Sequence, residues 1–446
     1  SEMCIRDSYG EVQIKQLNDR SKMYYTPNKE NNVFQLVVQY GAGEREFPKL
    51  GYAAQLMNNA GIMGAYEPQE LKEELSKLNA TCHVTADDDN LYIIMEGYEA
   101  TLPQACQLLS RQILMPKLDE KQLARLKGSA MGMRQQRKDN VSILNEALRQ
   151  YMLYGEKSDY IKELTDKEIY ELQISELTGD INRASNYEAK VFFTGTLPFD
   201  QVYDILSKNL PLVANERPSN SPQAKDMMPV TENTVYFLPN NDAEQAQIHL
   251  YIPMQKADKK DDVLRSAFNQ YFGLDFTGIV LNEIREKRSM AYTAYAFVGT
   301  QGIAGKASYL RGYIGTQNDK ANDALDVLMG LVNDMPKNPE RIDNIKSYLR
   351  QAMLTSHPSF RNKAMELVDL GYRGYTDDPA KENLPKVDAL TFDDIVKFYE
   401  ENIKDKPYCI SIMGNPKNID LKRLEKFGKV VKLNERKLFN TKDALF

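Results

Sequence analysis

Two stretches of the chain alternate apolar and polar residues in the manner of half-buried strands. Residues 33–40 (VFQLVVQY) and 246–252 (AQIHLYI) are rich in β-branched and aromatic side chains, so each predicts a strand. Each is followed by a charged amphipathic helix that runs into another alternating strand, at 71–86 (LKEELSKLNATCHVTA) and at 281–296 (LNEIREKRSMAYTAYA). The second copy begins 210 residues after the first, which indicates an internal repeat.

A shared tripeptide supports the repeat. MPK occurs at 115–117 and at 335–337, each time between an amphipathic helix and a longer helix, and the offset here is 220 residues. Two units of one design whose loops differ by about ten residues explain both offsets. The expected fold class is therefore α+β. We expect two tandem homologous units, each a mostly antiparallel sheet with helices packed on one face.

The boundary between the units is expected near residues 220–225. The stretch 212–231 contains Pro, Ser, Asn and charged residues without periodicity, which is typical of a linker. We therefore expect domains at 9–222 and 223–446. Residues 1–8 (SEMCIRDS) resemble a translated sequencing adaptor and are left out of the fold argument. On this interpretation Cys4 is not a natural residue and the gene begins further upstream.

Composition narrows the class of protein. With 42% hydrophobic and 27% charged residues, the chain is expected to fold into globular domains. Its 57 basic and 63 acidic side chains give a net charge of −6, which offers no general attraction to nucleic acid or to anionic lipid. No apolar run reaches the roughly eighteen residues that a membrane span requires. Cys82, Cys106 and Cys409 show no CxxC spacing and are odd in number, which argues against a disulfide framework.

Two short stretches carry a family resemblance. GYAAQLMNNAG at 51–61 follows the first long strand, and NEIREKRSMAYTAYA at 282–296 places Arg285 and Tyr292 seven residues apart. With these two stretches in this order, the sequence resembles zinc peptidases of the insulinase and pitrilysin type, in particular bacterial ones. The resemblance extends over almost the whole chain. The resemblance implies a protein built of paired halves, each with two α+β units. One half carries an H-x-x-E-H zinc motif, and the degenerate half often supplies an Arg and a Tyr from its second unit.

The zinc motif is absent from this chain. The matching stretch places Ala54 and Asn58 at the two histidine positions and Met57 at the glutamate position. None of these can bind zinc or take a proton from a zinc-bound water. The segment from Lys121 to Lys138 contains no acidic residue that could supply a third ligand. We therefore expect no cofactor in this chain and a zinc ion in a partner half.

Other candidates for a metal site have simpler interpretations. The three histidines, His83, His249 and His357, are far apart and have no partner three or four residues away, so we expect structural roles for them. The run Asp87–Asn90 lies between two alternating segments and lacks the glycine and terminal glutamate of a calcium loop. It predicts a hairpin turn.

Arg285 and Tyr292 are the candidate catalytic residues. On a helical wheel Arg285 lies opposite the apolar residues Phe276, Ile279, Val280 and Ile284, so it faces water or a cavity. A guanidinium beside a phenol could donate hydrogen bonds to the oxyanion that forms during peptide hydrolysis. A solvated arginine and a packed tyrosine remain the ordinary alternative. The first unit has Leu75 and Cys82 at the equivalent positions, so the pair belongs to the second unit alone.

The resemblance implies the metal-free half of an insulinase-like peptidase, inactive alone. This half would form part of the chamber wall and supply Arg285 and Tyr292 for the hydrolysis of an unstructured peptide. The metal-bearing half would lie upstream in the same polypeptide or in a separate subunit. Two alternatives stay open: an inert scaffold or interaction subunit, and a peptide-binding module without hydrolysis. The resemblance favours a periplasmic or cell-envelope location, and a cytoplasmic one also stays open.

Overall fold

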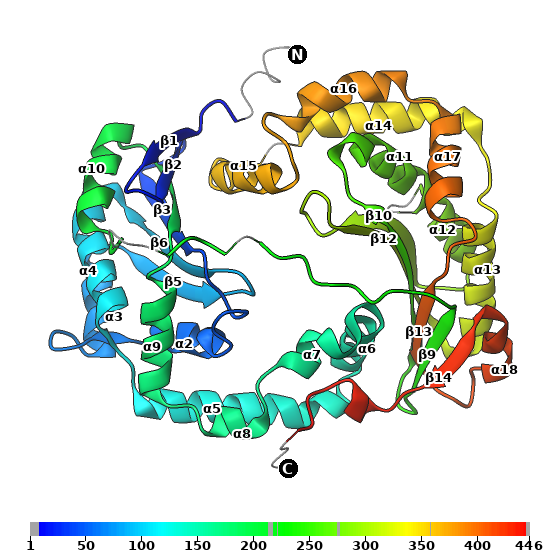
Figure 1. The fold of residues 1–446 in the computed structure, drawn as a ribbon, viewed down its shortest axis with the longest axis horizontal. Coiled ribbons are helices and arrows are strands. Elements are labelled where there is room, and N and C mark those ends of the chain that lie inside the picture. The colour runs from blue at the N-terminus through cyan, green and yellow to red at the C-terminus, as the bar shows by residue number, and fades with distance from the viewer. Residues whose placement is uncertain (1–8, 213–216, 221, 274–276, 357, 443–446) are drawn as a thin grey trace.

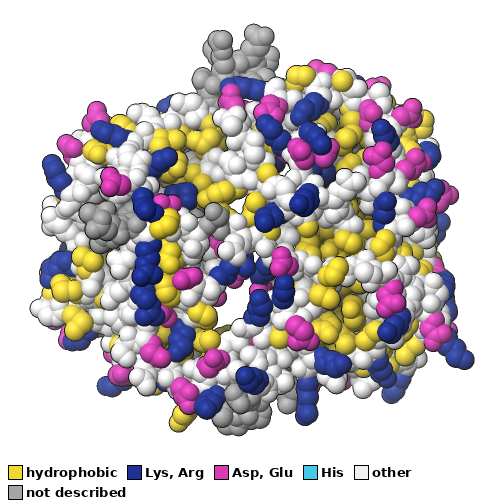
Figure 2. Space-filling model, in the orientation of Figure 1, with side chains coloured by type: hydrophobic (Ala, Val, Ile, Leu, Met, Phe, Trp, Pro, Cys, Tyr) yellow, Lys and Arg dark blue, Asp and Glu magenta, His cyan; other side chains and the backbone are white. Residues whose placement is uncertain are grey.

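The protein has two α+β units arranged around a central opening. The computed structural model describes residues 9–442 except 213–216, 221, 274–276 and 357. One unit lies on each side of the ring in Figure 1. Helices α5 (Glu120–Gln136) and α8 (Asp166–Tyr170) lie along its lower rim, and α15 (Lys363–Tyr372) and α16 (Pro379–Ala389) along its upper rim. Figure 2 shows a hollow at the centre of the same face, with acidic and basic side chains around it.

Each unit contains one six-stranded sheet. The first has the order β1 (Gln13–Gln16), β2 (Lys22–Pro27), β8 (Ala189–Gly195), β3 (Val33–Tyr40), β6 (Leu91–Tyr98) and β5 (Thr81–Ala86). The second has the order β11 (Thr293–Thr300), β12 (Ala307–Gln317), β10 (Gln245–Lys256), β13 (Cys409–Gly414), β9 (Thr234–Pro239) and β14 (Lys429–Lys432). The short strands β4 (Gly61–Ile62) and β7 (Pro116–Lys117) form a separate pair.

The two sheets share the same connectivity over five strands. The series β2, β8, β3, β6, β5 corresponds to β9, β13, β10, β12, β11, and the pairs β2–β8 and β9–β13 are both parallel. The strand pairs from β3 to β5 and from β10 to β11 are antiparallel. The predicted fold class of two homologous, mostly antiparallel units is therefore confirmed. The predicted strand 33–40 coincides with β3, and 246–252 lies within β10.

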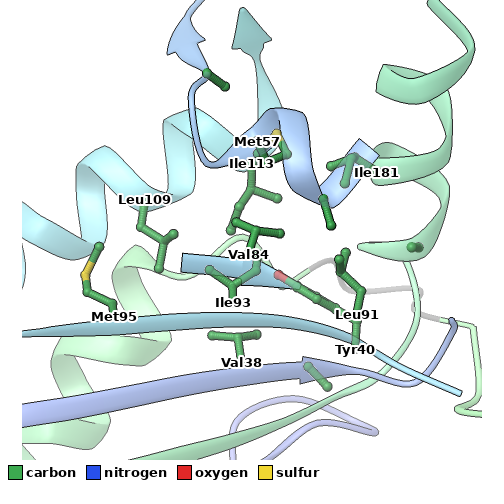
Figure 3. Packing of buried hydrophobic residues seen from close by; sticks show 14 of the residues in the cluster. Val38, Tyr40, Met57, Val84, Leu91, Ile93, Met95, Leu109, Ile113 and Ile181 are labelled. Carbon is green, nitrogen blue, oxygen red and sulfur yellow. The ribbon is translucent and has the colours of Figure 1, made fainter. Parts of the chain in front are cut away.

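The helices of each unit cover the outer face of its own sheet. The first unit uses α2 (Leu50–Met57), α3 (Pro68–Lys77), α4 (Leu102–Leu114), α9 (Ile174–Ala184) and α10 (Phe199–Asn209). In the second unit α11 (Asp262–Phe272), α12 (Ile279–Leu281) and α13 (Ala321–Asn333) contact the strands. Helices α14 (Ile342–Thr355), α16 (Pro379–Ala389) and α17 (Phe392–Asn402) pack on α11, and α18 (Leu421–Leu424) joins the same core. Figure 3 shows Val38, Ile93 and Met95 of the first sheet beneath Leu109 and Ile113 of α4. Alternating strand residues thus meet a helical stripe.

The inner face of each sheet receives a helix from the other unit. In the first unit α5 (Glu120–Gln136) leads to α6 (Val141–Tyr154), whose Leu144 and Leu148 pack with Leu238 and Met413 of the second sheet. In the second unit α14 leads to α15 (Lys363–Tyr372), whose Ala364 packs in a cluster of the first sheet. The exchange is reciprocal, and it leaves the inner faces only partly covered.

The remaining elements are short. Helices α7 (Asp159–Lys162) and α8 (Asp166–Tyr170) lead back from α6 to α9. The turn between β5 and β6 closes through a hydrogen bond from the Asp87 amide to the Asn90 carbonyl, as the sequence predicted.

In the described part of the chain, no helix is both long and apolar enough to cross a lipid bilayer.

Candidate functional site

The segment that carries Arg285 ends in an irregular helical turn. After α12, residues Asn282–Glu286 form a π-helical turn, and the Lys287 amide donates to the Asn282 carbonyl. Ile284 is fully buried beneath the turn, while the Arg285 side chain is 44% exposed on the opposite side. The predicted orientation of Arg285 is therefore observed, although Phe276 lies outside the described residues. Turns of this kind are rare and often occur at functional sites.

A reverse turn brings Tyr292 back beside Arg285. Ser289 adopts a left-handed conformation with φ of 50°, and its carbonyl accepts a hydrogen bond from Lys320 Nζ at 3.2 Å. The hydroxyl of Thr316 donates to the carbonyl of Met290. The Tyr292 amide then donates to the Gly315 carbonyl at 2.9 Å, where the edge strand β11 begins. Contacts with the end of β12 and the residues after it therefore hold the turn.

Arg285 and Tyr292 line the same surface pocket. Its volume is about 410 Å³, and its lining consists of Arg285, Glu286, Ser289, Met290, Ala291, Tyr292, Gln317 and Lys320. The Tyr292 side chain is 54% exposed. Its hydroxyl oxygen accepts a long hydrogen bond from Gln317 Nε2 at 3.4 Å, which leaves the hydroxyl proton free to be donated to a ligand.

The charges around the pocket leave Arg285 available. Glu283 forms ion pairs with Lys287 and Arg288, and these hydrogen bonds hold the pKa of its carboxyl below the usual value. The nearest carboxylate to Arg285 is that of its neighbour Glu286, at 3.6 Å. Lys320 adds a second cation to the lining, against the single carboxylate of Glu286. The pocket therefore offers hydrogen-bond donors and a surplus of positive charge to a developing anion.

Sequence reasoning missed Gln317 and Lys320. Both approach Tyr292 because β11 and β12 pair in a register that sets Thr293 opposite Gly315. A two-residue hairpin turn fixes which residues of its two strands lie opposite each other. The loop at 301–306 between β11 and β12 is longer than that, so the sequence did not show that residue 317 lies near residue 292.

The zinc-motif positions have become part of the core. Ala54 and Met57 on α2 are each about 1% exposed. Figure 3 shows Met57 among the side chains of Val84 and Ile113. Asn58 binds the backbone of the edge strand β5, because its amide group donates to the Val84 carbonyl at 2.9 Å and accepts from the Val84 amide at 2.7 Å. These residues do not fit a zinc ion.

The described residues contain no metal site elsewhere. No cluster of three or more His, Cys, Asp or Glu side chains there could hold an ion. His83 is exposed on β5 of the first sheet, whereas His249 is buried on β10 of the second. His357 lies outside the described residues.

A larger cavity lies elsewhere in the ring. It has a volume of about 1240 Å³ and is lined by residues of the first unit, of the 222–226 segment and of the β11–β12 loop. Its acidic and basic side chains pair with one another; Lys225 contacts Asp88 at 3.3 Å and also Asp159. Because most of these charges are already paired, the cavity offers less to a charged ligand than the pocket at Arg285.

Comparison with known proteins relates part of this chain to one peptidase family. Residues 185–349 match the family described as the peptidase M16 inactive domain. No curated protein sequence is significantly similar to this chain. Together with the two repeated units and the overwritten zinc positions, this match confirms the resemblance to the degenerate half of an insulinase-type metallopeptidase.

Solved structures share the fold over most of the chain. The peptidase M16 inactive domain of Pseudomonas fluorescens aligns with 91% of this chain and 98% of its own, at 17% identity and a TM-score of 0.70. The ferredoxin protease FusC, solved with Arabidopsis ferredoxin, aligns with 91% of this chain at 13% identity and a TM-score of 0.70. The periplasmic protease PqqL of Escherichia coli aligns with 90% at 12% identity and a TM-score of 0.69. This chain spans about half of each protease, 45% and 46% of their lengths.

Proposed function

We propose that this chain is the metal-free half of a zinc-dependent peptidase and that it supplies Arg285 and Tyr292 to the reaction. The observation that carries the proposal is the shared, open pocket of these two side chains. The substrate class is an unstructured peptide, and the partner is a metal-bearing half, either fused to this chain or separate from it. The ring of two units would form one wall of the chamber between the halves.

The chemistry of the pocket suits transition-state stabilisation. When water attacks a peptide carbonyl, the carbonyl oxygen becomes negative. The Arg285 guanidinium carries a permanent charge, and the Tyr292 hydroxyl can donate its proton in a hydrogen bond to the same oxygen. Neither group needs to change protonation state for this role. In this chain the two residues would orient and polarise the scissile carbonyl, while activation of water would be the task of the partner.

Replacement of Arg285 tests the proposed role. In the assembled enzyme, Arg285→Ala should lower kcat by about 100-fold or more, the usual cost of one lost oxyanion donor. The zinc content of the enzyme, measured by atomic absorption, should stay the same because no ligand is touched. Tyr292→Phe should also lower kcat, because it removes the hydroxyl that donates to the same oxygen.

Arg288→Ala is the matched control. Arg288 lies three residues further along the chain, just after the π-helical turn, and pairs with Glu283 away from the pocket lining. It should leave kcat within a factor of about two. If Arg285→Ala also leaves kcat unchanged while this chain is still required for assembly, the inert-scaffold alternative is correct.

A further inference from the structure

The inner face of strands β11 and β12 carries a partly exposed aromatic surface. Tyr295 and Phe297 of β11 lie beside Tyr313 and Arg311 of β12, because the register pairs Tyr295 with Tyr313 and Phe297 with Arg311. The ring centres of Tyr295 and Tyr313 are 5.3 Å apart, and those of Tyr295 and Phe297 are 6.0 Å apart. All four side chains are partly exposed, and the three rings belong to none of the hydrophobic clusters of the described residues.

Arg311 stands on this surface without a partner in the described part of the chain. Its Nε atom is buried and makes no hydrogen bond, and its guanidinium forms no ion pair there. The sequences of β10, β11 and β12 contain no acidic residue. A partly buried guanidinium without a carboxylate is costly to a folded protein, because its lost hydration is not replaced.

The neighbouring helix does not neutralise Arg311. On α6, Glu146 is held by Arg149, whose Nε donates to it at 2.7 Å. Burial opposes the ionisation of Glu146, but the hydrogen bond from Arg149 and the charges of Arg149 and Arg311 outweigh it and lower the pKa of the carboxyl. This part of the inner face therefore holds two guanidinium groups and one carboxylate, a surplus of one positive charge.

His249 adds no charge to this balance at neutral pH. It lies between α6 and the sheet, with Nε2 3.1 Å from Asn145 Oδ1 and its ring 5.0 Å from that of Tyr313. Burial, with the nearby charges of Arg311 and Arg149, lowers its pKa to about 3. The surplus charge thus rests on the arginines.

We propose that the inner face of β11 and β12 binds an extended peptide, and that Arg311 pairs with the carboxylate of an Asp or Glu side chain in that peptide. The guanidinium can hold a carboxylate through two parallel hydrogen bonds, and the three rings offer apolar contact to the flanking residues. This inference rests on the proposed function, because it narrows the peptide substrate to an acidic class.

The position of Arg311 sets the spacing of the acidic residue. Arg311 is paired with Phe297, five residues along β11 from Tyr292. At about 3.3 Å per residue, this separation is roughly 17 Å. A peptide lying along β11 would therefore place an acidic side chain on Arg311 about five residues from the bond held at the Arg285 pocket.

Peptide binding to the full chain alone tests the inference. The probes are two fluorescein-labelled peptides with amidated C-termini and the same sequence, except for one central Glu or Gln. By fluorescence anisotropy the Glu peptide should bind about tenfold more tightly, as expected for a charge-assisted hydrogen bond. Arg311→Gln should abolish this preference, and Arg311→Lys should retain part of it. Arg288→Gln, which removes a charge elsewhere, should leave the preference intact.

Several outcomes would overturn the inference. They are equal binding of the two peptides by the unaltered chain, and a preference for Glu that survives Arg311→Gln. A third concerns the Gln peptide with a free C-terminal carboxylate in place of the amide. If this peptide binds as tightly as the Glu peptide, Arg311 recognises the C-terminal carboxylate of a peptide and not an acidic side chain. If Arg311→Gln lowers the midpoint of thermal unfolding, Phe297→Ser serves as a second test variant. It should lower the affinity for both peptides to the same extent. Unchanged affinity in that variant would exclude the aromatic surface.

This experiment is independent of the test at Arg285. It measures binding without a metal-bearing half and without hydrolysis. A failure at Arg285 with a retained Glu preference would leave a peptide-binding module, whereas the reverse result would leave a catalytic half with another means of recognition.

Discussion

Met57 stands where peptidases of this type are expected to hold the residue that takes a proton from water, and here it fills space. Its side chain is almost fully buried in the core of the first unit, and Ala54 one turn earlier is buried as well. At both positions the side chain is therefore part of the packed core and offers no group that could bind a zinc ion.

Restoring the carboxylate at this position should be costly. Met57→Glu should lower the free energy of unfolding by about 3–5 kcal/mol, because a buried carboxylate has no partner there. Urea denaturation followed by circular dichroism would measure this change. Met57→Leu, which keeps the volume, should cost less than about 1.5 kcal/mol. A Met57→Glu variant as stable as the original would contradict the packing seen around α2.

The sequence reveals some of these residues and hides others for physical reasons. The overwritten positions Ala54 and Met57 were readable because the helix after the first strand keeps its place in the chain. The separation of Arg285 and Tyr292 was readable as a pattern. The role of Asn58 was not, because its bonds to Val84 depend on the distance between α2 and β5. Arg311 was missed because alternation assigns a residue to a face without showing what covers that face.

At the scale of elements, the contact of α6 with the second sheet is the most consequential. Leu144, Ala147 and Leu148 bury their side chains against β9 and β13, while Asn145 reaches His249 on β10. The sequence predicted neither this pairing nor the π-helical turn at 282–286, for which an ordinary helix was expected. The pattern of an amphipathic helix shows which of its faces is buried but not which element covers that face. A π-helical turn adds one residue to a single turn, which is too short a segment to leave a periodic pattern in the sequence.

The buried histidine gives this contact a pH dependence. Because the pKa of His249 falls to about 3 in the folded chain, the unfolded chain binds an extra proton between about pH 6.5 and 3. Stability should therefore decrease as the pH falls through this window. Replacement by His249→Gln should make the plot of unfolding free energy against pH less steep, by at most about 1.4 kcal/mol per pH unit.

Urea denaturation at a series of pH values would measure this slope. His83→Gln, at an exposed position on β5, is the matched substitution. An unchanged slope in His249→Gln would show that the α6 contact opens enough to hydrate the imidazole.

At the scale of the whole molecule, the two units are joined by exchange as well as by the linker. The predicted boundary at 222/223 separates the strands of the two sheets. Helices α6 and α15 nevertheless each pack on the sheet of the opposite unit. The assignment of residues 9–222 and 223–446 to two domains stays a prediction, because an independent folding unit would have to be stable without the helix it receives.

Cutting the linker should not separate the units. With a protease site inserted between Pro222 and Gln223, the two fragments should still elute together in size-exclusion chromatography. Each buried apolar side chain of the exchanged helices contributes about 1.5–3 kcal/mol, so the sum exceeds what one cut removes. Leu148→Asp in the cut protein should weaken the association, because Leu148 is fully buried in the α6 contact. Fragments that elute separately without this substitution would contradict the exchange.

The exchange also has a consequence for the order in which the protein is made. Helix α6 leaves the ribosome long before β13, one of the strands on which it packs. At synthesis rates of about 5–20 residues per second, its apolar stripe waits on the order of tens of seconds for that strand. During this interval the apolar face of α6 is exposed on the nascent chain. We therefore expect a chaperone that holds unfolded chains to bind α6 before β13 is made.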